Sequence, residues 1–314
     1  MNKSKPIIVS ASRATDIPAF YGDWFMDKLE RGHCSWINPF NGKKKRISFE
    51  NLRLIVFWTK NPEPFIKYLN RIDEMGYNYY FLYTLNDYEE DGLEPNLPSL
   101  ESRIKSFKKL STILGKEKVL WRFDPLILTE KIDINNLINK INRVGERIQK
   151  YTKRLIFSYA DIEKYNSVKK NLRQKNISYI KMSKKDKHNI AKKISELNKN
   201  WHLEINTCAE DVELERYGIY KGKCIDDKIM INCFYEDKKL MEYLGVSKKF
   251  NINSESPKNL KDRGQRKECK CIESKDIGQY ETCMHLCYYC YANKNPKKVK
   301  HNLENHNYHL DTIC

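Results

Sequence analysis

The chain has 314 residues, of which 40% are hydrophobic and 12% aromatic, and this composition excludes both a small disulfide-stapled module and a disordered protein. The formal net charge of +17 is compatible either with a polyanionic partner such as nucleic acid or with a lysine-rich solvated surface. No apolar run is long enough for a membrane span or a signal peptide, so we expect a cytoplasmic protein without membrane contact, whose ten cysteines are thiols or metal ligands.

Six short apolar runs, rich in β-branched or aromatic residues, predict six β-strands at residues 7–12, 52–59, 78–85, 118–123, 154–159 and 202–207. Amphipathic stretches between them predict helices at residues 21–30, 63–75, 100–114, 134–151 and 184–197. This alternation is typical of a parallel sheet covered by helices. Because the chain has no GxGxxG or Walker loop, we predict an α/β fold of the TIM-like (β/α)6 type, a barrel or partial barrel.

Polar residues follow each predicted strand, and in such barrels the carboxyl ends of the strands carry the chemistry. Any one of these residues fits a helix cap or a turn, as Asp124 before Pro125 does. Taken together they predict a polar pocket that holds a charged ligand. The strand-end residues that we assign to this pocket are Ser12, Arg13, Asp16, Lys60, Arg122, Asp124, Asp161 and Asn206.

The helix and strand periodicity ends near residue 250, so we predict a barrel domain at residues 1–250 and a cysteine-rich segment at residues 251–314, packed on the barrel mouth. Cys283, Cys287 and Cys290 form a C-x3-C-x2-C run in this segment. Three such thiolates can bind three irons of a 4Fe–4S cluster and leave the fourth iron open for S-adenosylmethionine (SAM). Structural iron–sulfur and zinc sites are the alternatives, although zinc usually binds paired C-x2-C units and this run has one.

Four further cysteines predict a second metal site. Cys208 ends the sixth predicted strand, Cys224 lies in the following loop, and Cys269 and Cys271 precede the C-x3-C-x2-C run. Four thiolates are sufficient for a fully ligated 4Fe–4S cluster, and a zinc ion takes the same ligands.

Several of these segments resemble the bacterial family called domain of unknown function 1848, namely residues 8–21, 57–62, 122–125, 207–210 and 264–292. In that family the terminal cysteine cluster is likened to that of radical SAM enzymes, and this resemblance implies a reaction class rather than a substrate. The C-x3-C-x2-C-Tyr-Ala string is also similar to the cluster motif of spore photoproduct lyases, which repair DNA. Typical radical SAM enzymes place the three cysteines after the first barrel strand, whereas here they follow all six predicted strands, so the order is permuted.

We therefore predict a radical SAM-type iron–sulfur enzyme that cleaves SAM reductively and takes electrons from a donor such as flavodoxin or ferredoxin. Its predicted catalytic residues are Arg13, Asp16, Lys60, Arg122 and Asp124. Its predicted cofactor contacts are Ser12, Arg13, Lys60, Arg122, Asp161, Asn206 and Tyr289. Its predicted metal ligands are Cys283, Cys287 and Cys290, with Cys208, Cys224, Cys269 and Cys271 as the second set. The alternative is a nucleic-acid-binding protein in which the cluster or zinc is structural.

Overall fold

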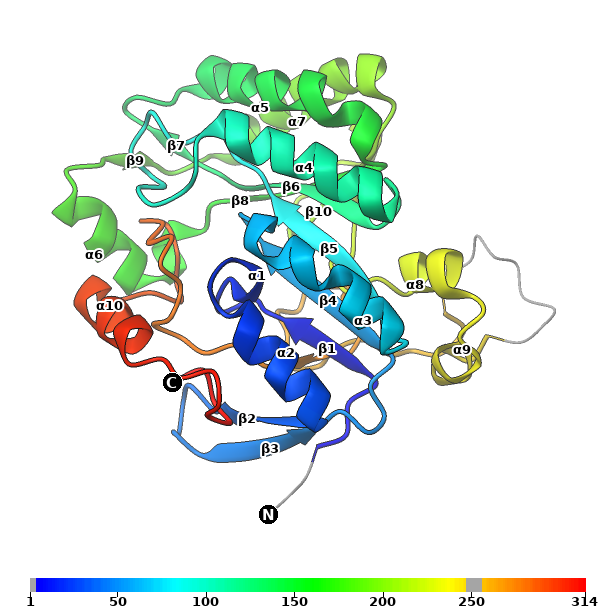
Figure 1. Cartoon of the computed structure of the whole chain (residues 1–314). Helices are drawn as coiled ribbons and strands as arrows, with labels where there is room; N and C mark the ends of the chain where they lie inside the picture. Colours follow the sequence, from blue (N-terminus) through cyan, green and yellow to red (C-terminus); the bar gives the residue numbers. More distant parts are fainter. Residues whose placement is uncertain (1–3, 247–255) are drawn as a thin grey trace.

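A computed structural model describes residues 4–246 and 256–314, and its framework is one parallel sheet of eight strands (Figure 1). The strands lie in the order β11-β10-β8-β6-β5-β4-β1-β12, and every neighbouring pair is parallel. In chain order they are β1 (Ile8–Ala11), β4 (Leu54–Thr59), β5 (Asn78–Thr84), β6 (Val119–Leu126), β8 (Arg154–Tyr159), β10 (Glu204–Thr207), β11 (Ile219–Lys221) and β12 (Lys275–Asp276). The six predicted strands are confirmed, and they are neighbours in the order of the chain.

Helices follow most of these strands, as the alternation in the sequence predicts. They are α1 (Ile17–Phe20), α2 (Gly22–Arg31), α3 (Leu69–Glu74), α4 (Leu100–Leu114), α5 (Ile134–Ile148), α6 (Asn166–Gln174), α7 (Lys184–Trp201), α8 (Asp227–Phe234), α9 (Lys238–Leu244) and α10 (Pro296–Glu304). Side-chain caps fix the start of several, because the oxygens of Asp16, Ser99, Asp133 and Ser183 accept free backbone amides of the first turn. The predicted helix at 63–75 begins as a 3-10 helix, Glu63–Tyr68, before α3.

Two small antiparallel pairs lie outside the main sheet: β2 (His33–Ile37) with β3 (Lys44–Ser48), and β7 (Leu128–Thr129) with β9 (Tyr179–Ile180). Neither pair is predicted by the sequence pattern. The first half of β3 is exposed and charged, so it lacks the apolar pattern of a buried strand.

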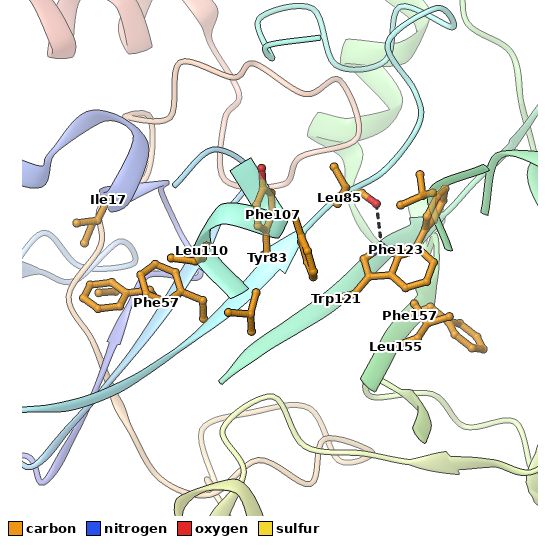
Figure 2. Packing of buried hydrophobic residues seen from close by; sticks show 14 of the residues in the cluster. Ile17, Phe57, Tyr83, Leu85, Phe107, Leu110, Trp121, Phe123, Leu155 and Phe157 are labelled. Carbon is orange, nitrogen blue, oxygen red and sulfur yellow. Dashed lines mark hydrogen bonds between the residues drawn. The ribbon is translucent and has the colours of Figure 1, made fainter. Parts of the chain in front are cut away.

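Both faces of the sheet are covered by apolar side chains. On one face Phe57, Phe81 and Trp121 pack against the helices that follow the strands, and Figure 2 shows this cluster. The alternate residues, among them Val56 and Leu82, face the opposite way and pack with residues of α8 and α9. Two buried faces explain why the strands are near-continuous apolar runs in the sequence. They also leave the strand ends as the main place for charged groups.

The C-terminal segment is joined to the start of the chain. β12 pairs with β1. The rings of Tyr21 and His306 lie 4.8 Å apart, and the amide of Asn171 in α6 donates to the carbonyl of Asn293. Residues 256–314 therefore contribute both a strand of the main sheet and a cover for its N-terminal part. In the part of the chain that is described, no helix has the length and hydropathy of a membrane span.

Phe57 gives a test of this packing. Its ring is fully buried and stacks on Phe81 with centroids 4.8 Å apart, so Phe57→Ala should lower the free energy of unfolding by about 3–5 kcal/mol. The matched control is Phe40→Ala, because Phe40 is 91% exposed and its removal should change stability by less than about 0.5 kcal/mol. Urea denaturation measures both, and equal losses would show that the described core is wrong.

Candidate functional site

The cysteine loop, residues 283–290, lies against the carboxyl ends of β1, β4 and β5. Three contacts join it to the residues that follow these strands: Asp16 with His285, Lys60 with Tyr289, and Asn86 with Tyr289. Backbone groups of the loop add to them, because the amide of Tyr288 donates to the carbonyl of Leu93 at 3.0 Å. The C-x3-C-x2-C run is therefore at the end of the sheet where parallel α/β proteins place their sites.

Asp16 is buried and connects three segments of the chain. Its Oδ1 accepts the backbone amide of Ala19 at 3.0 Å and so caps α1. Its Oδ2 accepts the backbone amide of Lys60 at 2.7 Å and lies 2.8 Å from Nε2 of His285. The Phe20 ring packs on the imidazole with centroids 4.7 Å apart. Asp16 was predicted as a catalytic residue, and in this geometry its oxygens position the cysteine loop.

Glu94 is the centre of a second buried network. Its Oε1 accepts Nζ of Lys60 at 2.6 Å and the side-chain amide of Asn86 at 3.1 Å, and the Tyr289 hydroxyl donates to it. The Arg103 guanidinium lies 3.7 Å from its other oxygen. Burial raises the pKa of Glu94, but the positive charges of Lys60 and Arg103 outweigh burial, so the pKa is lowered. The carboxylate is therefore ionised and Lys60 is already paired.

Arg122 and Asp124 form an ion pair at the end of β6, with Nη2 and Oδ2 2.5 Å apart. The hydroxyl of Ser158 donates to the same carboxylate. The Arg122 guanidinium lies 4.8 Å from the centre of the Trp58 ring, and the Arg13 guanidinium lies 5.5 Å from it. Among the described residues, Nε of Arg122 and the indole N–H of Trp58 are buried without a hydrogen-bond partner. Buried donors are normally satisfied, so these two indicate a place for an acceptor.

Ser12, Asp161 and Asn206 have local partners. The Ser12 hydroxyl accepts the backbone amides of Ala14 and Thr15 at 2.9 and 3.1 Å, which is the geometry of a turn. Asp161 pairs with Lys164 in the loop after β8. Asn206 is buried in β10, and its side-chain amide donates to the carbonyl of Ile205 at 3.1 Å, while its Oδ1 has no partner among the described residues.

The three thiols of the cysteine loop lie within electrostatic range of one another. Burial raises the pKa of Cys283, and the nearby Asp16, Cys287 and Cys290 add to the rise. Within the described ranges, no three His, Cys, Asp or Glu side chains are arranged around a single metal ion. A 4Fe–4S cluster does not require such convergence, because each thiolate binds a different iron.

The second predicted cysteine set is also brought together from distant segments. The sulfurs of Cys208 and Cys224 are 3.5 Å apart, and the sulfur of Cys271 accepts the backbone amide of Cys224 at 3.2 Å. Cys269 hydrogen-bonds the sulfur of Cys271, and this contact raises the pKa of Cys269.

Glu94 and His285 are among the residues of the site that were not predicted from the sequence. Glu94 lies in a loop between β5 and α4, and nothing in its local sequence separates it from an exposed loop carboxylate. His285 lies inside the cysteine motif, and this position is the feature of the sequence that could have identified it as a site residue. Both become recognisable through burial with charged or polar partners.

A family model described as a domain of unknown function (DUF1848) matches residues 8–292 of the chain. No curated protein matches the chain. No solved structure matches it either. The assignment of a function therefore depends on the geometry of the site.

The Glu94 network gives a pH-dependent test. Glu94→Gln leaves the buried Arg103 and the half-buried Lys60 without their anion, so it should lower the free energy of unfolding by about 3–5 kcal/mol at pH 7. A lowered folded-state pKa stabilises the protein above the ordinary value of 4.5, and this contribution is lost as the pH falls through the folded-state value. The difference between the variant and the unmodified chain should therefore shrink below pH 4.5, as measured by urea denaturation at several pH values.

Glu101→Gln is the matched control for this substitution. Its carboxylate also has a lowered pKa, caused by a hydrogen bond from Arg147, but it is on the surface. Exposed ion pairs contribute little to stability, so this variant should unfold like the unmodified chain. A Glu94→Gln variant as stable as the control at pH 7 would contradict the charge assignment in the network.

Proposed function

The chain belongs to the family described as domain of unknown function DUF1848, and we propose that it is an iron–sulfur enzyme of the radical SAM type. In this proposal Cys283, Cys287 and Cys290 hold a 4Fe–4S cluster at the carboxyl ends of the strands. The observation that carries it is the attachment of the cysteine loop to three strand ends through Asp16, Lys60 and Asn86.

The donor set fits such a cluster. Soft thiolate ligands favour iron–sulfur clusters, and three of them on one loop leave one iron without a protein ligand. Tyr288 and Tyr289 pack against the main apolar cluster and so shield the loop from water. His285 and Tyr289 are each held by a buried carboxylate, Asp16 and Glu94, so the loop has a fixed position.

When bound, the cluster supplies the electron that cleaves the sulfonium bond of SAM. The remaining contributions come from side chains of the mouth. The unpartnered donors of Arg122 and Trp58 are suited to bind a carboxylate of SAM or of an anionic substrate. Lys60 neutralises Glu94 and fixes the Tyr289 hydroxyl, so we assign it to positioning. Electrons would come from a small donor protein such as flavodoxin or ferredoxin.

We also propose that the parallel sheet curves into a partial barrel with the cysteine loop at its mouth. Six strands follow one another in chain order from β1 to β10, which is the strand order of a (β/α) barrel. The face that carries Val56 and Leu82 would be the interior, and α8 and α9 would fill it. In this proposal residues 1–250 form the barrel and residues 251–314 the iron–sulfur segment.

The test is the EPR spectrum of the full chain, prepared anaerobically and reduced with dithionite. We expect a 4Fe–4S signal that changes when SAM is added, together with formation of 5′-deoxyadenosine. Cys287→Ala should abolish both the SAM-dependent change and the product, because it removes one ligand of the proposed cluster.

Cys314→Ala is the control, because this thiol lies outside both cysteine sets and donates to the carbonyl of Asn302. It should leave the signal and the product unchanged. A chain that contains iron but gives a signal indifferent to SAM, with no 5′-deoxyadenosine, would refute the radical SAM proposal.

A specific surface feature favours the second candidate function, nucleic acid binding. A hollow of about 710 Å³ lies along α6 and the strand after it, and its lining includes Lys169, Lys170, Arg173 and Tyr179. Cations beside an aromatic ring are typical of sites that bind single-stranded nucleic acid. None of the residues predicted for the strand-end pocket lines this hollow.

Fluorescence anisotropy with a single-stranded oligonucleotide tests this candidate. If the three cations neutralise three phosphates, affinity should fall about 20-fold between 50 and 200 mM salt, and replacing all three by alanine should remove most of that dependence. The control replaces Lys297, Lys298 and Lys300 of α10. Equal effects of the two triple variants would show that binding follows overall charge rather than this hollow.

A further inference from the structure

The hairpin of β2 and β3 carries an exposed aromatic ring at its tip. The two strands pair outside the main sheet, and the loop between them covers residues 38–43 (Figure 1). The ring of Phe40 in this loop is 91% exposed, and no other large apolar side chain of the described residues is as exposed. A single exposed apolar residue is common on protein surfaces, so the ring indicates a contact only together with its surroundings.

The loop holds this ring in a defined position. The backbone amide of Gly42 donates to the carbonyl of Asn38 at 2.9 Å, and the amide of Asn38 donates to the carbonyl of Lys43 at 3.0 Å. The side-chain oxygens of Asn38 and Asn41 accept the backbone amides of Phe40 and Lys43 at 2.9 and 3.0 Å. The loop is therefore closed by its own polar groups, and the Phe40 ring is presented to the outside.

The base of the hairpin is fixed to the body of the protein. Cys34 and Ile47 are fully buried in the main apolar cluster. The amide of Ser35 donates to the carbonyl of Asp311 at 2.8 Å, and the amide of Ser48 in the other strand donates to a carbonyl of the N-terminal segment, also at 2.8 Å. A partner bound at the tip thus meets a preorganised support, and less of the binding free energy is lost in ordering the protein.

Four consecutive cations close the loop and begin β3: Lys43, Lys44, Lys45 and Arg46. All four are exposed, and none of them forms an ion pair with another of the described residues. Alternate residues of a strand point to opposite faces, so Lys44 and Arg46 lie on one face of the hairpin and Lys45 on the other. The positive charge beside the Phe40 ring is therefore not neutralised within the described structure, and a polyanion is its complement.

We propose that this hairpin binds single-stranded nucleic acid, with the four cations on phosphates and the Phe40 ring stacked on a base. Phosphates supply the negative charge in any sequence, and every base has a face on which an aromatic ring stacks. An anionic membrane surface would also attract the cations. Membrane binding scales with buried apolar area, however, and the loop offers one large apolar ring between Asn38 and Asn41, so nucleic acid is the better complement.

The proposal does not depend on the iron–sulfur centre. It goes beyond the second candidate function, because it assigns a surface other than the hollow along α6. No residue of the hairpin lines that hollow. In the hollow, moreover, Lys169 is already 3.7 Å from the carboxylate of Glu163, whereas the hairpin cations have no such partner among the described residues.

Two variants of the full chain test the two parts of the proposal by fluorescence anisotropy with a single-stranded oligonucleotide of mixed sequence. Phe40→Ala should weaken binding at least about fivefold and leave its salt dependence unchanged, because it removes stacking and no charge. Replacing Lys43, Lys44, Lys45 and Arg46 together by alanine should remove the part of the salt dependence that they supply, about 50-fold in affinity between 50 and 200 mM salt.

Each variant has a matched control. Tyr220→Ala removes another exposed aromatic ring, 56% exposed in β11, and should bind like the unmodified chain. Replacing Lys294, Lys297, Lys298 and Lys300 by alanine removes four exposed cations in and before α10, and it should leave most of the affinity. Circular dichroism of each variant ensures that binding is compared among folded chains.

The outcomes separate this proposal from the others. Hairpin variants that bind the oligonucleotide like their controls would overturn it, and a simultaneous loss in the variant of Lys169, Lys170 and Arg173 would assign binding to the hollow instead. A loss confined to the hairpin variants would support the proposal and count against the hollow. A chain that binds vesicles of phosphatidylserine and phosphatidylcholine but no oligonucleotide would also overturn it. None of these results alters the EPR test of the iron–sulfur centre.

Discussion

The Asp16 carboxylate joins the beginning and the end of the chain, and the arrangement of the site depends on it. One oxygen caps α1, while the other accepts the Lys60 amide and contacts His285. A buried carboxylate is costly unless its hydrogen bonds are complete, so all three segments must be in place at once. Asp16 thus holds the cysteine loop against β1 and β4 through His285, and the contacts of Lys60 and Asn86 with Tyr289 add to this attachment.

The Glu94 network shows a related constraint on charge. Lys60 lies at a strand end, where a cation is suited to bind an anionic ligand, yet its ammonium group is already paired with Glu94 and hydrogen-bonded by Tyr289. Arg122 differs, because Asp124 occupies one side of its guanidinium while Nε has no partner among the described residues. Among the described residues at the strand ends, Arg122 and Trp58 therefore offer buried donors without a partner, and Asn206 offers a buried acceptor.

The sequence predicted the six central strands because both of their faces are buried, which makes each strand a short apolar run. It did not predict β12, whose two residues, Lys275 and Asp276, have no apolar pattern and pair with β1 only in the folded chain. The site residues also divide into those that the local sequence reveals and those that only the folded chain reveals. The cysteines were found by their spacing, whereas Glu94 acquires its role from partners distant in the sequence.

Apolar side chains cover both faces of the main sheet, so a charged side chain in the middle of a strand is unusual. Most cationic side chains of a folded protein lie on its surface instead. Arg122 is an exception, since its side chain lies on the face that carries Leu82 and Leu120, among thiols and beside the Trp58 ring. Arg13 faces the carboxylate of Asp276, and Arg266 is exposed to solvent. A buried guanidinium is stable only if anions or hydrogen-bond acceptors face it, so the charge of Arg122 depends on Asp124 and on the cysteines beside it.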